Sequence, residues 1–119
     1  MKRVLVVEDN NINRYMITFL LKEHGYTVIE ARDGVTGVDL AVKEKPDLII
    51  MDIQLPDING LEVTRRIRAS KADGNIPVIA LTSYAMAGDK EKALEAGCTG
   101  YIEKPIKPGT FIDKIEKYL

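Results

Sequence analysis

The chain has 119 residues, and its 17 lysines and arginines against 18 aspartates and glutamates give a formal net charge of −1. This length suits a single domain, which we expect to span residues 1–119, and the charge argues against nucleic acid as a partner. One cysteine, Cys98, excludes a fold built on internal disulfides, and no apolar run reaches the ~20 residues of a membrane span, so we expect a cytoplasmic protein.

In the first half of the chain, short apolar runs alternate with helical patterns. The run Val4–Val7 does not alternate with polar residues, which predicts a strand buried on both faces. Thr27–Glu30 has the mixed character of an edge strand, and Leu48–Met51 is again a buried strand. The helix before Thr27 is expected to bury one stripe, made of Ile12, Tyr15, Met16, Phe19 and Leu20. The apolar positions of the next helix are Val35, Val38 and Val42.

The second half continues the same alternation. Val78–Leu81 predicts another buried strand, and Gly100–Ile102 predicts a second edge strand. Three more helices are expected. Val63 and Ile67 mark the first of them, Gly97 ends the second, and Pro108 begins the third. The stretch Ala85–Asp89 at the start of the fourth helix contains a glycine, and we expect its first turn to fray.

The resulting order is a strand followed by a helix, five times over. This alternation predicts an α/β fold in one domain, a doubly wound five-stranded parallel sheet with helices on both faces. Ligands of such open sheets bind beyond the carboxyl ends of the strands, where the strand order reverses. The residues that end the strands are therefore the candidates for a functional site.

Polar residues end four of the five predicted strands. Glu8 and Asp9 follow the first strand, Asp52 ends the third, Thr82 ends the fourth, and Lys104 lies near the end of the fifth. If the three carboxylates converge, each pair repels by about 4 kcal/mol at ~4 Å and an effective dielectric near 20. A hard divalent cation offsets this repulsion, and Mg²⁺ prefers oxygen ligands. A pocket with a metal, a lysine and a hydroxyl suits a phosphoryl group, with ionised Asp52 as nucleophile.

Each of these residues also has an ordinary structural explanation. Asp9 can belong to a helix cap, Asp52 to a turn, and Thr82 to another cap, while a lone lysine such as Lys104 is usually solvated. Their placement at the ends of four separate strands favours the functional interpretation over coincidence.

The sequence resembles the receiver domain of two-component response regulators over its whole length. The resemblance rests on four motifs, Val7–Asn10, Met51–Gly60, Ala80–Ser83 and Lys104-Pro105. It implies a flavodoxin-like (βα)5 fold with the strand order 2-1-3-4-5.

The resemblance implies a role for each rim residue. Asp52 is expected to be the phosphoacceptor. Asp9, Asp52 and the backbone carbonyl of Gln54 are expected to bind Mg²⁺, with Glu8 acting mainly through a metal-bound water. Lys104 is expected to pair with the phosphoryl oxygens.

Further residues are implied in switching. Thr82 is expected to hydrogen-bond the phosphoryl group and shift toward it, and Tyr101 to turn inward when Thr82 moves. The bond to Pro105 is expected to be cis, and the small Ser83 is expected to leave access to the site. Gln54 and Tyr84 occupy positions that tune dephosphorylation rates in the family.

The function implied is a phosphorylation-activated signalling switch of a two-component phosphorelay. A histidine kinase or histidine phosphotransfer protein would supply the phosphoryl group, and a downstream protein target would read the changed surface. A face around Asn11, Asn13, Arg14 and Ile106 is a candidate for docking the donor.

The chain would catalyse its own phosphorylation and dephosphorylation without turning over a separate substrate, so it is not expected to be an enzyme. We expect no output domain and no membrane partner. Both a stand-alone regulator and a receiver of a hybrid histidine kinase fit.

Two other functions compete with the switch, and the sequence argues against both. A flavodoxin-like electron carrier shares the fold, but the acidic loop Glu8–Asn11 would repel the phosphate of FMN. A phosphatase related to haloacid dehalogenases would need an Asp-x-Asp nucleophile after the first strand, and the sequence has none there.

Overall fold

Strands and helices alternate through the computed structural model, which describes residues 2–70, 75–83 and 89–119. The strands are β1 (Arg3–Val7), β2 (Thr27–Ala31), β3 (Leu48–Asp52), β4 (Val78–Thr82) and β5 (Gly100–Glu103). The helices are α1 (Asn11–Glu23), α2 (Gly34–Glu44), α3 (Gly60–Ala69), α4 (Asp89–Glu95) and α5 (Pro108–Glu116). None of these helices is long and apolar enough to cross a membrane. Residues 84–88 lie outside the described residues. They include Tyr84 and all but the last residue of the turn that was expected to fray.

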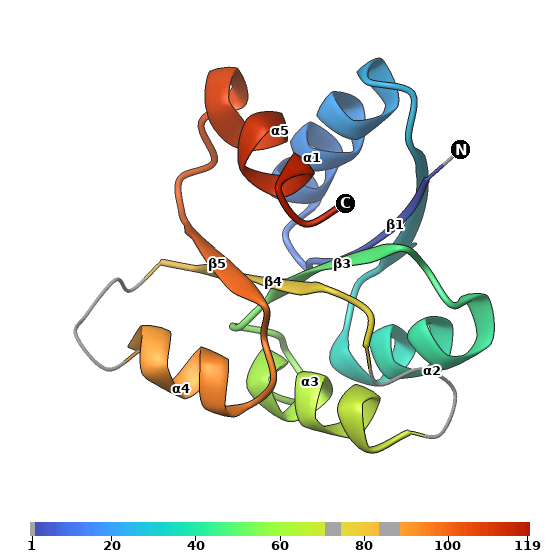
Figure 1. The fold of residues 1–119 in the computed structure, drawn as a ribbon, viewed down its shortest axis with the longest axis vertical. Helices are drawn as coiled ribbons and strands as arrows, with labels where there is room; N and C mark the ends of the chain where they lie inside the picture. The colour runs from blue at the N-terminus through green and yellow to red at the C-terminus, as the bar shows by residue number, and fades with distance from the viewer. Residues whose placement is uncertain (1, 71–74, 84–88) are drawn as a thin grey trace.

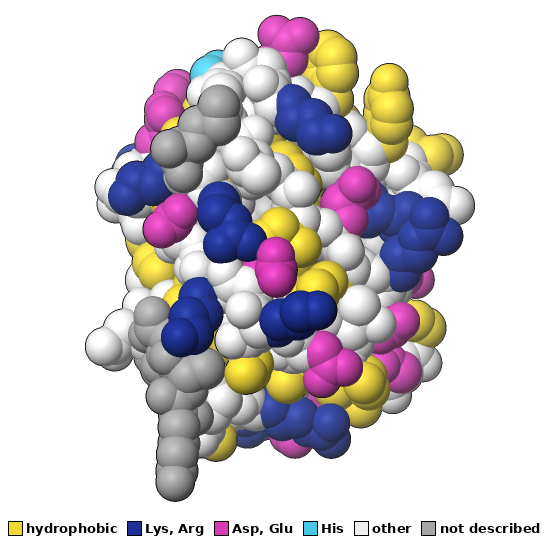
Figure 2. All heavy atoms as spheres, turned by 90° about the vertical axis from the view of Figure 1, so that its right-hand side faces the viewer, with side chains coloured by type: hydrophobic (Ala, Val, Ile, Leu, Met, Phe, Trp, Pro, Cys, Tyr) yellow, Lys and Arg dark blue, Asp and Glu magenta, His cyan; other side chains and the backbone are white. Residues whose placement is uncertain are grey.

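The five strands form one parallel sheet in the order β2-β1-β3-β4-β5, which confirms the predicted fold and strand order. β2 and β5 are the edge strands, as expected. Helices α1 and α5 cover one face of the sheet, and α2, α3 and α4 cover the other (Figure 1). On the side at the right of Figure 1, positive and negative side chains are interspersed (Figure 2). The order reverses between β1 and β3, so the ends of these two strands flank the switch point.

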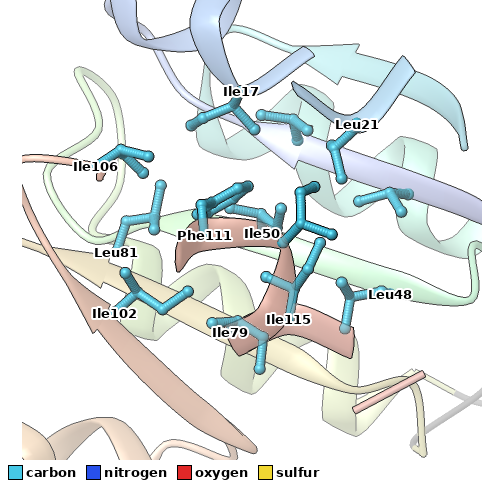
Figure 3. Close-up of a cluster of buried hydrophobic side chains, with 13 residues drawn as sticks. Ile17, Leu21, Leu48, Ile50, Ile79, Leu81, Ile102, Ile106, Phe111 and Ile115 are labelled. Atoms are coloured by element: carbon cyan, nitrogen blue, oxygen red, sulfur yellow. The ribbon is translucent and has the colours of Figure 1, made fainter. Parts of the chain in front are cut away.

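Alternate residues of the strands fill two apolar cores, one on each face of the sheet. In β1, Val4 and Val6 belong to the core under α1 and α5, whereas Leu5 and Val7 belong to the core on the opposite face. Phe111 of α5 reaches into the first of these cores (Figure 3). Burial on both faces explains why the strand sequences are continuously apolar.

The buried face of α1 differs from the predicted stripe. The buried residues of this helix are Arg14, Ile17, Thr18 and Leu21. Ile12, Tyr15 and Phe19 are 79%, 73% and 51% exposed, so the prediction is wrong for these three. Met16 and Leu20 pack partly against the core. Apolar residues lie around most of the circumference of α1, so their spacing alone did not identify the inner face.

Helix α2 is present where the valine pattern predicts a helix, but it approaches the sheet through small residues rather than through its valines. Its buried residues are Gly34, Gly37 and Ala41. Val35 is 50% exposed, and Val38 and Val42 are only partly buried. A Cβ atom at Gly37 would lie 3.0 Å from the side chain of Val7, so a residue without a side chain allows the close approach of α2 to β1.

Short polar side chains begin the helices that follow β1, β2 and β3. The side chain of Asn10 accepts a hydrogen bond from the backbone N–H of Asn13 at 2.9 Å and caps α1. Asp33 and Asn59 cap α2 and α3 in the same way. Because Asn10 supplies the cap of α1, the exposed carboxylate of Asp9 is left at the rim of the sheet.

Candidate functional site

β1 leads into two acidic residues of very different exposure. Glu8 is fully buried, and its backbone N–H donates to the carbonyl of Ala31 on β2 at 3.0 Å, whereas Asp9 is exposed. The guanidinium group of Arg14 donates to the backbone carbonyl of Glu8 at 2.9 Å and to that of Asp9 at 3.5 Å. Helix α1 therefore holds the turn that carries both carboxylates.

Asp52 is the last residue of β3, and it is 2% exposed. Its Oδ1 accepts a hydrogen bond from the backbone N–H of Gln54 at 3.1 Å. Helix α3 begins close by, since the N–H of Gly60 donates to the carbonyl of Ile53 at 2.8 Å. A Cβ atom at Gly60 would collide with the backbone carbonyl of Asp52, so this approach requires glycine.

Lys104 reaches across the sheet edge to the ends of β1 and β3. Its Nζ lies 3.1 Å from Oε1 of Glu8 and 3.1 Å from Oδ1 of Asp52, and its side chain is largely buried. The backbone N–H of Lys104 donates to the carbonyl of Thr82 at 2.7 Å. The Lys104-Pro105 peptide bond is cis, as expected. The loop after β5 is therefore tied to both β4 and the acidic residues.

Thr82 and Tyr101 occupy different levels of the sheet. Thr82 ends β4 at the same rim as Asp52 and is buried. Tyr101 lies on β5 opposite Ala80, two residues before Thr82, and it is half-buried. The Nζ of Lys90 lies 5.5 Å from the centre of the Tyr101 ring, a cation–π distance. Tyr101 therefore lies below the rim that carries the carboxylates.

The three carboxylates lie close enough to share a cation. One oxygen from each of Glu8, Asp9 and Asp52 lies within 4.8 Å of the others. When ionised, these three groups outnumber the single ammonium of Lys104. Oε2 of Glu8 is buried and has no hydrogen-bond partner among the described residues. An oxygen donor set with an orphaned buried carboxylate atom fits a hard cation such as Mg²⁺.

The ionisation of the cluster reflects this excess of negative charge. Burial and then the neighbouring carboxyl group of Asp52 raise the pKa of Glu8 from 4.5 to about 7, against the opposing effect of Lys104. Burial by itself would lower the pKa of Lys104, but attraction to Asp52 and Glu8 outweighs burial and raises it. Lys104 is therefore held as a cation. The carboxyl group of Glu8 resists ionisation because the cluster lacks a second positive charge.

The structure brings together most of the residues selected from the sequence. Glu8, Asp9, Asp52 and Lys104 form one cluster, Thr82 stands beside it, and Gln54 contacts Asp52 through its backbone. Tyr101 is not part of this cluster.

Two contributors to the geometry of the rim were missed. The sequence indicates Arg14 only as a docking candidate, yet its guanidinium group donates to the backbone carbonyls of the β1 turn. Asp57 was noted only as part of a motif, yet its carboxylate accepts hydrogen bonds from the N–H groups of Gly34 and Val35 at 2.7 and 2.9 Å. The Asp57 contact joins segments more than twenty positions apart, and the Arg14 contact joins a helix side chain to backbone carbonyls five and six positions earlier, so no local sequence pattern signals either one.

Comparison with known proteins agrees with this geometry. The profile of the response regulator receiver domain matches residues 4–116. Similar curated proteins include the polar-differentiation response regulator DivK of Brucella anthropi and that of Brucella ovis. Each is 46% identical over 118 residues, which cover 99% of this chain and 96% of the relative.

Solved structures of similar proteins include chemotaxis protein CheY4 of Vibrio cholerae, with a TM-score of 0.95 and 30% identity over 100% of this chain and 99% of that one. They also include the receiver domain of a sensor histidine kinase from Pseudomonas aeruginosa, with a TM-score of 0.90 and 37% identity over 98% of this chain and 96% of that one. The Pseudomonas structure has a magnesium ion coordinated in its active site cleft. The chain belongs to the response regulator receiver domain family.

Proposed function

We infer that this chain is a phosphorylation-activated switch of a two-component phosphorelay, with Asp52 as its phosphoacceptor. The observation that carries the inference is the buried carboxylate of Asp52, which lies 3.1 Å from a lysine ammonium and within an acidic cluster. The similarity to DivK and to the receiver of a histidine kinase supports the same conclusion.

The acidic residues supply the ligands for Mg²⁺ in this proposal. Asp9 and Asp52 would hold the ion directly together with the backbone carbonyl of Gln54, and Glu8 would act through a water. When bound, Mg²⁺ would supply positive charge for the phosphoryl oxygens. The magnesium ion in the Pseudomonas receiver and the orphaned oxygen of Glu8 both support this assignment.

Phosphoryl transfer then needs a nucleophile and a counter-charge. A carboxylate oxygen of Asp52 attacks the phosphorus atom of a phosphohistidine on the donor. A phosphorus–oxygen bond forms, the phosphorus–nitrogen bond breaks, and the electron pair leaves with the imidazole nitrogen. Lys104 already lies within ion-pair distance of Asp52, so it can hold the transferred group without a large rearrangement.

The response of the fold starts from the charge that the phosphoryl group adds, about −1.5 to −2 at neutral pH. Thr82 stands at the neighbouring strand end, and its hydroxyl donates to the phosphoryl group after a shift toward it. Tyr101 is half-buried two residues away in the β4–β5 register, and it turns inward when Thr82 moves. The surface around α4, β5 and α5 then differs between two states.

The partners follow from this chemistry. A histidine kinase or a histidine phosphotransfer protein supplies the phosphoryl group, and a protein target distinguishes the two states of the surface. The chain modifies and later dephosphorylates itself, and it turns over no separate substrate. An acidic rim beside β1 also disfavours the FMN-binding alternative, since it would repel the flavin phosphate.

The decisive experiment is labelling by acetyl phosphate with Mg²⁺, followed by intact-mass measurement. We expect one added phosphoryl group on the native chain and none on Asp52→Asn, which keeps the shape of the side chain. Asp113→Asn, at an exposed position on α5, is the matched control and should be labelled like the native chain. Persistent labelling of a folded Asp52→Asn variant would refute the assignment.

A further inference from the structure

Helix α1 presents a stripe of large apolar side chains to solvent. Ile12, Tyr15 and Phe19 follow one another at spacings of three and four residues, which places them on one face of the helix. They are 79%, 73% and 51% exposed. Single exposed apolar residues are common on proteins, whereas apolar residues gathered on one exposed face are typical of contact surfaces.

A groove runs beside this stripe, between α1 and the edge strand β2. It encloses about 460 Å³ and is lined by Asn11, Arg14, Tyr15, Thr18, Phe19, Lys22, Glu30 and Arg32. We call it the α1–β2 groove. The other flank of α1 carries Met16 and Leu20, which pack against the core that α5 helps to close. The α1–β2 groove therefore lies on the side of α1 away from α5, and it is separate from the acidic cluster.

The charges of the groove are unbalanced. The guanidinium group of Arg14 lies 3.2 Å from Oε1 of Glu30, so these two charges compensate each other. Lys22 and Arg32 form no ion pair with an acidic group in the part of the chain that the structure describes. Figure 2 shows hydrophobic side chains projecting at the upper right of this side of the molecule, above a group of Lys and Arg side chains.

The two cations lie at opposite ends of the aromatic pair. Lys22 is in the last turn of α1, whereas Arg32 follows β2 at the end of the groove where Asn11 begins the helix. At 1.5 Å per residue, the helix spans about 16 Å from Asn11 to Lys22. A segment lying in the groove would therefore meet positive charge at both ends and aromatic surface in the middle.

A polar atom in the groove lining also lacks a partner. Oγ1 of Thr18 is buried and makes no hydrogen bond within the described residues. Threonine can bond back to the helix carbonyl four residues earlier, as Thr64 does with Gly60 at 2.9 Å. Thr18 belongs to the groove lining, and its hydroxyl makes no such bond.

We propose that the α1–β2 groove docks an acidic protein segment, whose apolar side chains cover Tyr15 and Phe19 and whose carboxylates pair with Lys22 and Arg32. Charge complementarity selects this occupant, because both uncompensated charges of the lining are positive. A lipid surface fits less well, since the site is a hollow with polar side chains at its base. Docking does not depend on phosphoryl transfer, so the proposal stands apart from the function proposed above.

The test uses the full, unphosphorylated chain labelled with ¹⁵N and a synthetic helical peptide of about twelve residues, enough to span the groove. The peptide carries glutamates in both terminal turns and leucine and phenylalanine between them. We expect saturable chemical-shift changes at Tyr15, Thr18, Phe19, Lys22 and Arg32. Lys22→Glu combined with Arg32→Glu should weaken binding about tenfold or more, since two exposed attractions become repulsions.

Matched variants separate the groove from general charge. Lys43→Glu combined with Lys92→Glu changes the net charge equally at exposed positions outside the groove, and it should bind the peptide like the native chain. Tyr15→Ser combined with Phe19→Ser removes exposed aromatic rings without opening the core, and it should also weaken binding.

Four outcomes would overturn the proposal. The first two are the absence of shifts at millimolar peptide and equal binding by the Lys22 and Arg32 double variant. The third is a set of shifts centred on a second pocket, which lies between β5 and α5 and is lined by Tyr101, Lys104 and Phe111 among others. The fourth is binding only to phosphatidylserine vesicles. Self-association that the charge-reversed double variant abolishes, with no peptide binding, would instead assign the groove to a second copy of this chain.

Discussion

The ammonium nitrogen of Lys104 lies 3.1 Å from Oδ1 of Asp52, although the two residues are 52 positions apart in the chain. The same nitrogen lies 3.1 Å from Oε1 of Glu8, so one cation serves two buried carboxylates. Removing one member of a buried ionic group leaves the remaining charge without compensation, which costs more than a surface pair is worth.

Replacing Lys104 by methionine should therefore destabilise the fold. We expect Lys104→Met to lose about 3 kcal/mol of unfolding free energy in Mg²⁺-free buffer, as when one partner of a buried pair is removed. Urea denaturation measures this change. Lys107→Met is the control, because Lys107 is exposed, and it should change stability by less than about 0.5 kcal/mol. Equal losses in the two variants would show that the cluster adds nothing beyond a surface charge.

Magnesium should stabilise the native chain through the acidic cluster. A ligand that binds only the folded state adds about 1.4 kcal/mol at ten times its Kd. Thermal unfolding with Mg²⁺ and with EDTA measures the difference. Asp9→Asn should reduce this difference because it removes one of the three clustered carboxylates, whereas Asp39→Asn, at an exposed position on α2, should preserve it. An undiminished Mg²⁺ effect in Asp9→Asn would contradict the role proposed for Asp9.

Asp57 should confer a pH-dependent contribution to stability. Hydrogen bonds from the backbone N–H groups of Gly34 and Val35 hold the pKa of Asp57 at about 2, below its usual 3.8. The pKa of Asp57 is lower in the folded chain than in the unfolded chain. At pH values above the unfolded pKa, the ionised carboxylate therefore stabilises the fold. This contribution is lost as the pH falls through the folded pKa.

Asp57→Asn removes the ionisation but keeps one acceptor oxygen. We expect the variant to be less stable than the native chain at neutral pH and to lose less stability between pH 4 and pH 2. Urea midpoints across this range provide the measurement. Asp113→Asn should follow the native profile, since Asp113 is an exposed residue of α5. If the urea midpoints of the native chain and of Asp57→Asn fall in parallel as the pH is lowered, Asp57 does not contribute to the acid sensitivity of the fold.

Two glycine substitutions should have opposite signs. Gly60→Ala places a Cβ atom against the backbone carbonyl of Asp52, so we expect it to destabilise the fold by about 2 kcal/mol, as overpacking does. Gly109→Ala lies in α5, where no atom lies within 4 Å of the new Cβ, and it should stabilise by up to about 1 kcal/mol through helix propensity. Thermal or urea unfolding distinguishes them. A neutral Gly60→Ala would mean that α3 can withdraw from β3 at little cost.

The sheet and most of its rim were predictable because they depend on local pattern. Strands buried on both faces have continuously apolar sequences, and a parallel α/β sheet gathers the strand ends at one edge. Glu8, Asp52 and Lys104 could therefore be assigned to one site from their positions after three strands, and the structure places them in contact.

The helix faces were less predictable because tertiary contacts decide them. Arg14 is buried in place of an apolar residue since its guanidinium group finds Glu30 on β2 and the carbonyls of the β1 turn. That exchange turns Tyr15 and Phe19 outward. Likewise, α2 is positioned by the close approach of Gly37 to Val7 rather than by its valines. Neither partner is visible in the local sequence of its helix.

The contact of Lys104 with Glu8 and Asp52 has a consequence for folding cooperativity. A chain that has assembled only β1, β2 and β3 holds the carboxyl groups of Glu8 and Asp52 at neighbouring strand ends without their counter-ion, and their repulsion when ionised disfavours such a partly folded form. The last strand brings in the cation that relieves this repulsion. The charges of the site therefore couple the two ends of the chain and favour all-or-none formation of the sheet.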